Sequence, residues 1–187
     1  MARGYVRAAS PDEAERIAQV QLTTWRTAYR RLLPASVLDQ LDVAGLARHW
    51  RTAVTAPPSP RHRVLVAVEQ TADANELVGF AATGPADEHA AAPGEPAPPG
   101  PDTAAVTDLL VEPRWGRRGH GSRLLAATVE LWREDGFSTA VAWAFEADPA
   151  TRSFLTSAGW EPDGVRRALD VDDLLVPQLR YHTRLPD

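Results

Sequence analysis

The stretch from Leu109 to Arg123 holds the residues best suited to binding chemistry. It reads LLVEPRWGRRGHGSR, so an apolar strand enters a turn with three glycines and paired arginines. A helix opens at Gly119, and the first backbone N–H groups of a helix lack partners and carry partial positive charge. Glycines let a ligand approach that backbone closely, and Arg117 and Arg118 add charge at the same place. The stretch therefore predicts a phosphate-binding turn.

Two common nucleotide motifs fit this turn poorly. A Walker loop needs a lysine after its second glycine, but Gly121 is followed by Ser122 and Arg123. A dinucleotide fingerprint needs G-x-G-x-x-G near the start of a domain, and the order here is G-x-x-G-x-G. Binding of a nucleotide phosphate stays a third hypothesis, which competition with ATP or NAD would test.

Hydrophobic periodicity predicts the elements that must hold this turn. We expect a first helix from Ser10 to about Arg30, and a helical pair capped by Ser36 and Asp42. Two more helices are expected at 119–135 and 149–158. Strands are expected at 5–8, 63–69, 76–82, 103–111, 139–145, 165–171 and 178–184, with a turn at 176–177 between the last two. The order predicts one mixed α/β domain over residues 1–187 around a single sheet.

The proline-, glycine- and alanine-rich segment 84–102 interrupts this order. Its composition neither packs well nor extends a sheet, so we expect a mobile excursion between two neighbouring strands.

Composition excludes several classes of function. The formal net charge of −5 provides no basic field for nucleic acid and mildly favours a cationic partner. The absence of cysteine removes disulfides, cysteine–zinc sites and thiolate nucleophiles. His49, His62 and His89 have no metal-ligand spacing, so no metal is expected. With no signal-peptide pattern and no apolar run of membrane length, a cytoplasmic location and no membrane association are the default expectations.

The turn resembles the coenzyme-binding motif of the GNAT superfamily of N-acetyltransferases. Val111-Glu112-Pro113 matches its Val-x-Pro lead-in, and residues 116–121 match its (Gln/Arg)-x-x-Gly-x-(Gly/Ala) pattern. The opening helix with Trp25 and Tyr29, and the segment 148–160, are also similar to the family. The resemblance implies a mixed, mostly antiparallel sheet of about seven strands flanked by helices on both faces. It also implies acetyl-coenzyme A as co-substrate.

The resemblance assigns the coenzyme contacts residue by residue. Strand N–H groups would hold the acetyl carbonyl and pantetheine, the turn would hold the pyrophosphate, and the later helix would add two contacts. The expected positions are Leu109, Leu110, Val111, Gly116, Arg117, Arg118, Gly119, His120, Gly121, Ser122, Asp148 and Phe154. The sequence departs from the family at Gly116, where glutamine or arginine is usual, and at Leu155, where a tyrosine usually serves as general acid.

The catalytic candidates are Asp108, Glu146 and Tyr29. Strand alternation puts Asp108, Leu110 and Glu112 on one face, and we expect the other face, with Leu109 and Val111, to meet the core helices. Asp108 is then the candidate general base, or else a solvated or capping aspartate. Glu146 is a second base or a binder of a cationic substrate, and Tyr29 borders the acceptor pocket or belongs to the core. Water, Tyr29, Tyr181 or His182 could replace the missing acid.

Two functions follow from the resemblance. The first is transfer of an acetyl group from acetyl-coenzyme A directly to a primary amine of a small molecule or peptide. Without cysteine, an acetyl-cysteine intermediate cannot form. The second is a catalytically weak or inactive acyl-coenzyme A sensor of the same fold, which Gly116 and Leu155 favour. The resemblance also suggests a homodimer formed through the terminal strands.

Overall fold

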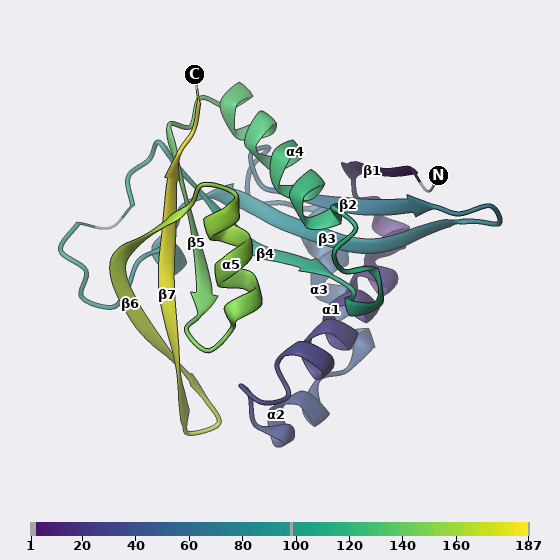
Figure 1. Ribbon diagram of the computed structural model, residues 1–187, viewed down its shortest axis with the longest axis horizontal. Coiled ribbons are helices and arrows are strands. Elements are labelled where there is room, and N and C mark those ends of the chain that lie inside the picture. The colour runs from purple at the N-terminus through teal and green to yellow at the C-terminus, as the bar shows by residue number, and fades with distance from the viewer. Residues whose placement is uncertain (1–2, 98, 187) are drawn as a thin grey trace. The chain divides into compact units, whose positions relative to one another are not determined.

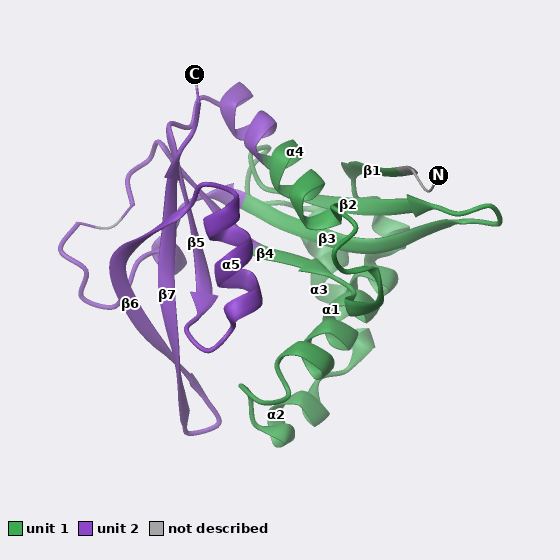
Figure 2. Cartoon of the chain, viewed as in Figure 1, with its two compact units in different colours: residues 1–83, 108–128 green, residues 84–107, 129–187 purple. Residues whose placement is uncertain are grey.

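The computed structural model describes residues 3–97 and 99–186, which form two compact units. Unit 1 combines the described residues up to Thr83 with Asp108–Thr128, and unit 2 combines Gly84–Thr107 with the described residues from Val129 onward (Figure 2). The strands follow the sheet order β1-β2-β3-β4-β5-β7-β6, which confirms the predicted mixed sheet of seven strands. Their bounds are β1 Arg3–Ala8, β2 Arg63–Gln70, β3 Asn75–Pro85, β4 Thr103–Val111, β5 Thr139–Phe145, β6 Glu161–Val171 and β7 Leu174–Arg184.

Unit 1 is an antiparallel arrangement of strands with helices packed on it (Figure 1). β2 pairs with β1 and with β3, and a bulge interrupts the second pairing between Ala67 and Val68. The helices are α1 Ala14–Ala28, α2 Ala35–Gln40 and α3 Val43–Thr55. Trp50 lies at the centre of their core, with its ring against Phe80 and its Nε1 donating to Gln21 at 2.7 Å. This core covers one face of the strands.

Capping residues fix where these helices begin. The Ser10 N–H donates to Glu13 Oε2 at 2.9 Å. This contact caps a short 3-10 helix at Pro11–Glu13, which leads directly into α1. Asp42 accepts from the Gly45 N–H at 2.7 Å and caps α3, as predicted. The prediction for Ser36 is wrong, because α2 begins one residue earlier and Pro34 occupies the cap position. Proline cannot donate a backbone N–H, so it suits that position.

Unit 2 joins parallel and antiparallel pairings around β5. β4 runs parallel to β5, while β7 pairs antiparallel with both β5 and β6, and α5 (Pro149–Ser157) packs on β5. The turn predicted at 176–177 is wrong: Val176 and Pro177 lie inside β7. The chain reverses instead at Asp172 and Asp173, whose positive φ values of 54° and 63° suit a tight hairpin.

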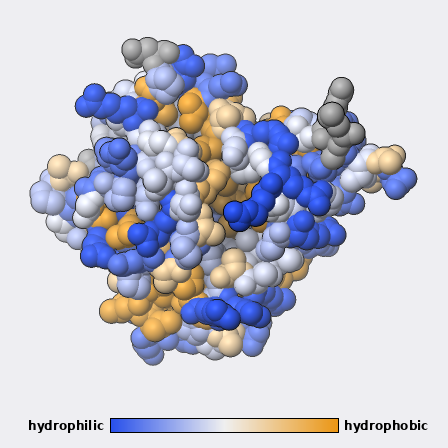
Figure 3. All heavy atoms as spheres, in the orientation of Figure 1, coloured by the Kyte–Doolittle hydropathy of each residue, from blue (hydrophilic) through white to orange (hydrophobic). Residues whose placement is uncertain are grey.

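The exposed apolar side chains of unit 2 follow this hairpin turn. Leu174 is 45% exposed and Leu175 is 65% exposed. On the face of the molecule shown in Figure 3, hydrophilic side chains surround smaller hydrophobic areas. Among the helices that the structure describes, none is both long and apolar enough to span a bilayer.

The segment 84–102 packs better than its composition predicts. Ala90 is buried against Ala105 and Val141, and its carbonyl accepts from Trp143 Nε1 at 3.2 Å and from Arg180 Nη1 at 3.1 Å. Arg180 also forms an ion pair with Glu95 at 2.6 Å. The expectation that this segment cannot pack is therefore wrong for its central part. Side chains on β7 and β5 supply the contacts that proline and glycine cannot make.

Candidate functional site

The turn at 112–122 lies in unit 1 and has the backbone that anion binding requires. A short 3-10 helix at Pro113–Trp115 follows β4, and α4 spans His120–Glu134. Between them Arg117 has a φ of 60° and Gly119 a φ of 80°. Both values lie in the left-handed region, which glycine adopts freely and arginine rarely does. The chain thus reverses direction before α4, whose first turn buries His120 and exposes Ser122.

Backbone donors gather at the start of α4. The first N–H that the helix itself satisfies belongs to Arg123, which donates to Gly119 O at 3.0 Å. The preceding N–H groups of His120, Gly121 and Ser122 have no carbonyl one turn back. The Arg123 side chain stiffens the turn, because Nη1 and Nη2 each donate to Arg118 O at 3.1 Å. Together these groups give the turn unpaired backbone donors of the kind that suit an anion, and the turn at 116–122 is referred to below as the seat.

The arginines of the turn have different partners. The guanidinium of Arg118 stacks 4.8 Å from the centroid of the Trp115 ring, and that of Arg114 lies 5.6 Å from it. Arg114 Nε also pairs with Glu112 at 2.7 Å. Arg117 is exposed and forms no hydrogen bond or ion pair within the described part of the chain. Arg117 and the outer edge of Arg118 are therefore the cations most available to a ligand.

The His120 side chain points into the protein, away from the seat. Its ring is 2% exposed and its Nε2 lies 3.1 Å from Oε2 of Glu69, which is 3% exposed. Nε2 still lacks a well-directed hydrogen bond, so the contact is electrostatic proximity at a poor angle. Burial lowers the pKa of His120; Glu69 opposes this, while Arg123 and Arg118 add to it. Only the backbone of His120 can serve an anion at the surface of the turn.

The strand before the turn is oriented differently from the prediction. Leu110, not Leu109 or Val111, belongs to the buried core against the helices of unit 1. Glu112 is also buried on that side, where Arg16 of α1 pairs with it at 2.5 Å. Charge pairing lets a carboxylate occupy the core face, which the alternation of apolar residues alone could not reveal. Asp108, two residues before Leu110, is half-buried and has a partner of its own.

Tyr29 ends α1 in the same unit. It is half-buried, and its ring centroid lies 6.2 Å from that of Trp25. The N–H of Tyr29 donates to the Trp25 carbonyl and closes the last helical turn. The two aromatic residues thus share one end of the helix, as their spacing predicts.

The remaining predicted residues lie in unit 2. Asp148 caps α5 by accepting from the N–H groups of Ala150 and Thr151, which confirms its capping role. Glu146 accepts from Arg166 Nη2 at 2.5 Å, so its carboxylate is not a free base. Phe154 is half-buried on α5, beside Leu155, which is 4% exposed and serves packing.

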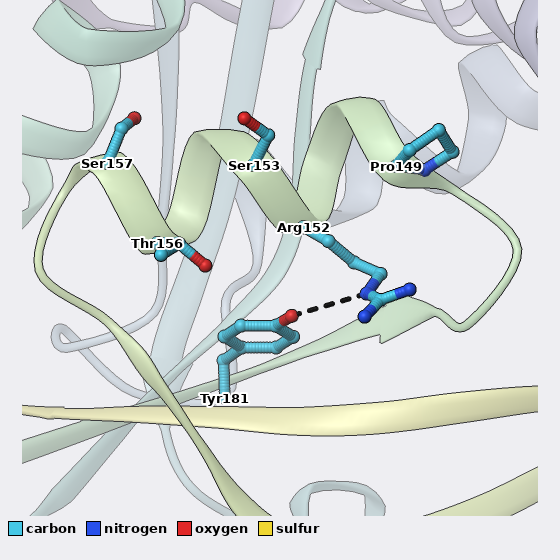
Figure 4. Close-up of a pocket in the computed structure, with 6 residues that line it drawn as sticks. All are labelled: Pro149, Arg152, Ser153, Thr156, Ser157 and Tyr181. Carbon is cyan, nitrogen blue, oxygen red and sulfur yellow. Dashed lines mark hydrogen bonds between the residues drawn. The ribbon is translucent and has the colours of Figure 1, made fainter.

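A shallow hollow of about 500 Å³ lies beside α5. Figure 4 shows Arg152 of α5 and Tyr181 of β7 facing each other across it, and Arg152 Nε donates to Tyr181 Oη at 3.4 Å. Arg152 Nη1 also donates to the Glu146 carbonyl at 2.9 Å. The other lining residues are Pro149, Ser153, Thr156 and Ser157.

Sequence reasoning missed Glu69, Arg123 and Arg152 as parts of these arrangements. Glu69 carried a usable signal, because it is an ionisable residue at the end of the apolar run 64–68. Arg123 donates to a backbone carbonyl, and Arg152 donates to a backbone carbonyl and to the distant Tyr181 hydroxyl, and such contacts leave no mark on the sequence.

The comparisons with known proteins agree with this geometry. The Acetyltransferase (GNAT) family model matches residues 14–160. A Bacillus subtilis (strain 168) protein described as the uncharacterized N-acetyltransferase YuaI is 29% identical over 145 residues, which is 78% of this chain and 73% of the relative. PaiA N-acetyltransferase from Thermoplasma acidophilum, solved in complex with coenzyme A, has a TM-score of 0.67 at 14% identity, covering 97% of this chain and 99% of that one. YncA from Salmonella typhimurium, a putative acetyltransferase solved with acetyl-CoA, has a TM-score of 0.65 at 14% identity, covering 99% and 95%. Because the family match spans most of the sequence, the chain belongs to the GNAT family of acetyltransferases.

Proposed function

We propose that this protein transfers an acetyl group from acetyl-coenzyme A directly to a primary amine of a small molecule or peptide. The observation that carries the proposal is the arginine-flanked helix start at 116–122, where unpaired N–H groups meet an exposed guanidinium. A diphosphate is the coenzyme group that such a seat suits best. Family membership supports the same donor.

The strand before the turn would stabilise the reacting carbonyl. In the proposed reaction the amine nitrogen attacks the thioester carbon, the C–S bond breaks and the amine gives up a proton. N–H groups of Leu109, Leu110 and Val111 are the proposed donors to the developing oxyanion. Since they belong to a fixed backbone, they need no reorganisation in the transition state.

Asp108 is the proposed general base, which takes up the proton that the amine loses. Glu146 forms an ion pair with Arg166, and its proposed role is to attract a cationic amine. Tyr29 keeps its proposed place at the acceptor pocket. No cysteine is present to carry a covalent acetyl group, which supports direct transfer.

Tyr181 is the preferred proton donor for the departing thiolate. Leu155 has no proton to give, and it is buried. Of the candidates that the sequence offers, Tyr181 lines the hollow beside α5, and its hydroxyl already accepts a hydrogen bond from Arg152.

Calorimetric titration with coenzyme A tests the donor half of the proposal. The double variant Arg117→Ala/Arg118→Ala should bind about 100-fold more weakly, because each lost charge-assisted hydrogen bond is worth about 1.4 kcal/mol. Arg48→Ala is the matched control, since Arg48 is exposed on α3, and its affinity should equal that of the wild type. If the double variant bound coenzyme A as tightly as the wild type, the result would count against the turn at 116–122 as the diphosphate site.

A thiol-release assay with polyamines, amino acids, aminoglycosides and peptides tests the acceptor half. Turnover with any amine supports the enzyme. Coenzyme binding without turnover across the panel would favour the alternative function, an acyl-coenzyme A sensor, which Gly116 and Leu155 support.

A further inference from the structure

Three strands of unit 1 place a row of residues beneath the first turn of α4. Gly4 of β1 is the cross-strand partner of Glu69 on β2, and Glu69 is in turn the partner of Glu76 on β3. Directly paired residues of antiparallel strands project from the same face of a sheet. The two carboxylates therefore share the face that is opposite the core of α1 and α3.

Glycine at position 4 lets α4 lie close to this row. A Cβ built on Gly4 would lie 3.0 Å from Cε1 of His120 and 3.1 Å from Cζ of Arg123. Any side chain there would displace both residues. The absence of a side chain therefore allows His120 to settle directly against Glu69.

The resulting contact places an ionisable ring against a buried carboxylate. Glu69 is 3% exposed, and its charged neighbours are Arg118 at 3.9 Å and the His120 ring at 3.1 Å. Burial, Arg118 and Arg123 favour the neutral ring, while Glu69 favours the charged ring and Glu76 adds a second carboxylate to the row. The protonation state of His120 therefore depends on two opposing effects: burial with the arginines, and the neighbouring carboxylate.

We propose that the buried Glu69–His120 pair supports the diphosphate turn and takes up a proton when the diphosphate binds. This inference rests on the proposed function. His120 begins α4, so its ring lies directly behind the backbone that would hold the anion. A bound diphosphate adds negative charge on the outer side of the ring, while Glu69 lies on the inner side. Two flanking anions stabilise an imidazolium that burial alone would disfavour.

The sign of the coupling follows from linkage. The ligand raises the pKa of His120 above its lowered value in the free protein. Binding therefore takes up protons between the two values, and affinity increases as the pH falls through that window. The dissociation constant should decrease by up to about tenfold per pH unit at the steepest point, and level off below the pKa of the free protein.

The test is calorimetry with 3′-dephospho-coenzyme A from pH 5.5 to 8. This ligand retains the diphosphate and lacks the monoester phosphate, whose own titration near pH 6 would interfere. Parallel titrations in two buffers with different protonation enthalpies give the number of protons taken up. The wild type should show an uptake approaching one proton near the middle of the window.

Glu69→Gln and His120→Gln should each abolish the uptake and make affinity nearly independent of pH. Glu15→Gln and His49→Gln are the matched controls, because both residues are exposed on helices of unit 1, and they should behave like the wild type. The wild-type titration decides the question without relying on any variant. Tight, pH-independent binding without proton uptake overturns this inference and leaves the proposed function intact, whereas no binding at any pH overturns the proposed function itself.

Discussion

At the scale of single residues, the four arginines around one turn each make different contacts. Arg123 holds the Arg118 carbonyl, Arg114 neutralises Glu112, and Arg118 stacks on Trp115. Arg117 makes no such contact in the described part of the chain. If the proposed diphosphate binds here, the backbone of the turn is already held in place, and the side chain of Arg117 is the part that binding would order.

The missing family tyrosine gives a prediction at the same scale. Tyr181→Phe should lower kcat by about 100-fold, the usual contribution of a general acid, while KM for the acetyl donor changes by less than about twofold. The hydroxyl is the only group removed, so the packing of the ring is kept. Steady-state kinetics with the best amine of the panel measures the effect.

Tyr5→Phe is the matched control for that prediction, because Tyr5 is 38% exposed on β1 and belongs to no proposed site. An unchanged kcat in Tyr181→Phe would assign protonation of the thiolate to water. If kcat fell in Tyr29→Phe instead, the general acid would be assigned to Tyr29 at the end of α1.

At the scale of elements, both ends of α4 have a glycine with a φ of 80°. Alanine at either position costs about 1 kcal/mol of folding free energy, because its Cβ disfavours the left-handed region. Gly119→Ala also places a Cβ 3.3 Å from Arg123 Nη1, which disturbs the hydrogen bonds that Arg123 donates to the Arg118 carbonyl. We expect Gly119→Ala to weaken coenzyme binding by about fivefold in addition to its effect on stability.

Gly136→Ala provides the comparison, since a Cβ there meets nothing within 4 Å. This variant should lose similar stability in urea and keep wild-type affinity for coenzyme A. The prediction fails if the two variants have equal affinities. In that case the conformation of the turn would be irrelevant to the seat.

Elements were predictable where the sequence carries a local physical signal. The apolar run at 64–68 predicts β2, and the cap at Asp42 predicts the start of α3. The turn at Asp172 and Asp173 was missed, because aspartate adopts positive φ less often than glycine and Pro177 was a stronger turn signal. Pro177 is tolerated inside β7 because it lies just before Gln178, the first β7 residue that pairs with β5, so the ladder does not need the N–H that proline lacks. Its carbonyl still accepts from the Glu146 N–H at 2.9 Å.

The candidate site was likewise predictable only where the signal is local in the sequence. The glycine–arginine turn follows from residue types and spacing alone, because its function depends on the backbone. The burial of His120 against Glu69 does not, since 51 positions separate them and the packing of α4 against β1 and β2 brings them together. Contacts between distant segments leave no periodic pattern in one sequence.

At the scale of the whole molecule, each unit contains a glutamate whose two carboxylate oxygens accept from a single arginine. In unit 1 Arg7 donates to both oxygens of Glu13, at 2.8 and 2.7 Å, and this contact is the main cause of a lowered pKa of Glu13. In unit 2 Arg180 does the same for Glu95, at 2.8 and 2.6 Å, and lowers the pKa of Glu95. The second pair holds the segment 84–102 in place.

These pairs predict acid sensitivity of the fold. A carboxylate whose pKa is lowered by folding stabilises the protein above its unfolded pKa of about 4.3 and loses that contribution as the pH falls through the folded value. The free energy of unfolding should therefore fall between about pH 5 and pH 3. Urea is the denaturant of choice, because it adds no salt to screen the pairs.

Substitution separates the two contributions. Glu95→Gln should cost about 2 kcal/mol at pH 7, since Arg180 and Glu95 are nearly buried, and Glu13→Gln less than about 1 kcal/mol, since solvent screens the half-exposed Arg7. Both variants should approach the wild type as the pH falls through the lowered pKa values of the native carboxylates, because protonation then removes the same ion pairs. Hydrogen exchange should then locate the loss: Glu95→Gln speeds exchange in the segment around Ala90, which Arg180 anchors, while Glu13→Gln speeds it at the start of α1. A Glu95→Gln protein with unchanged exchange there would show that Trp143 and Ala105 hold the segment without the ion pair.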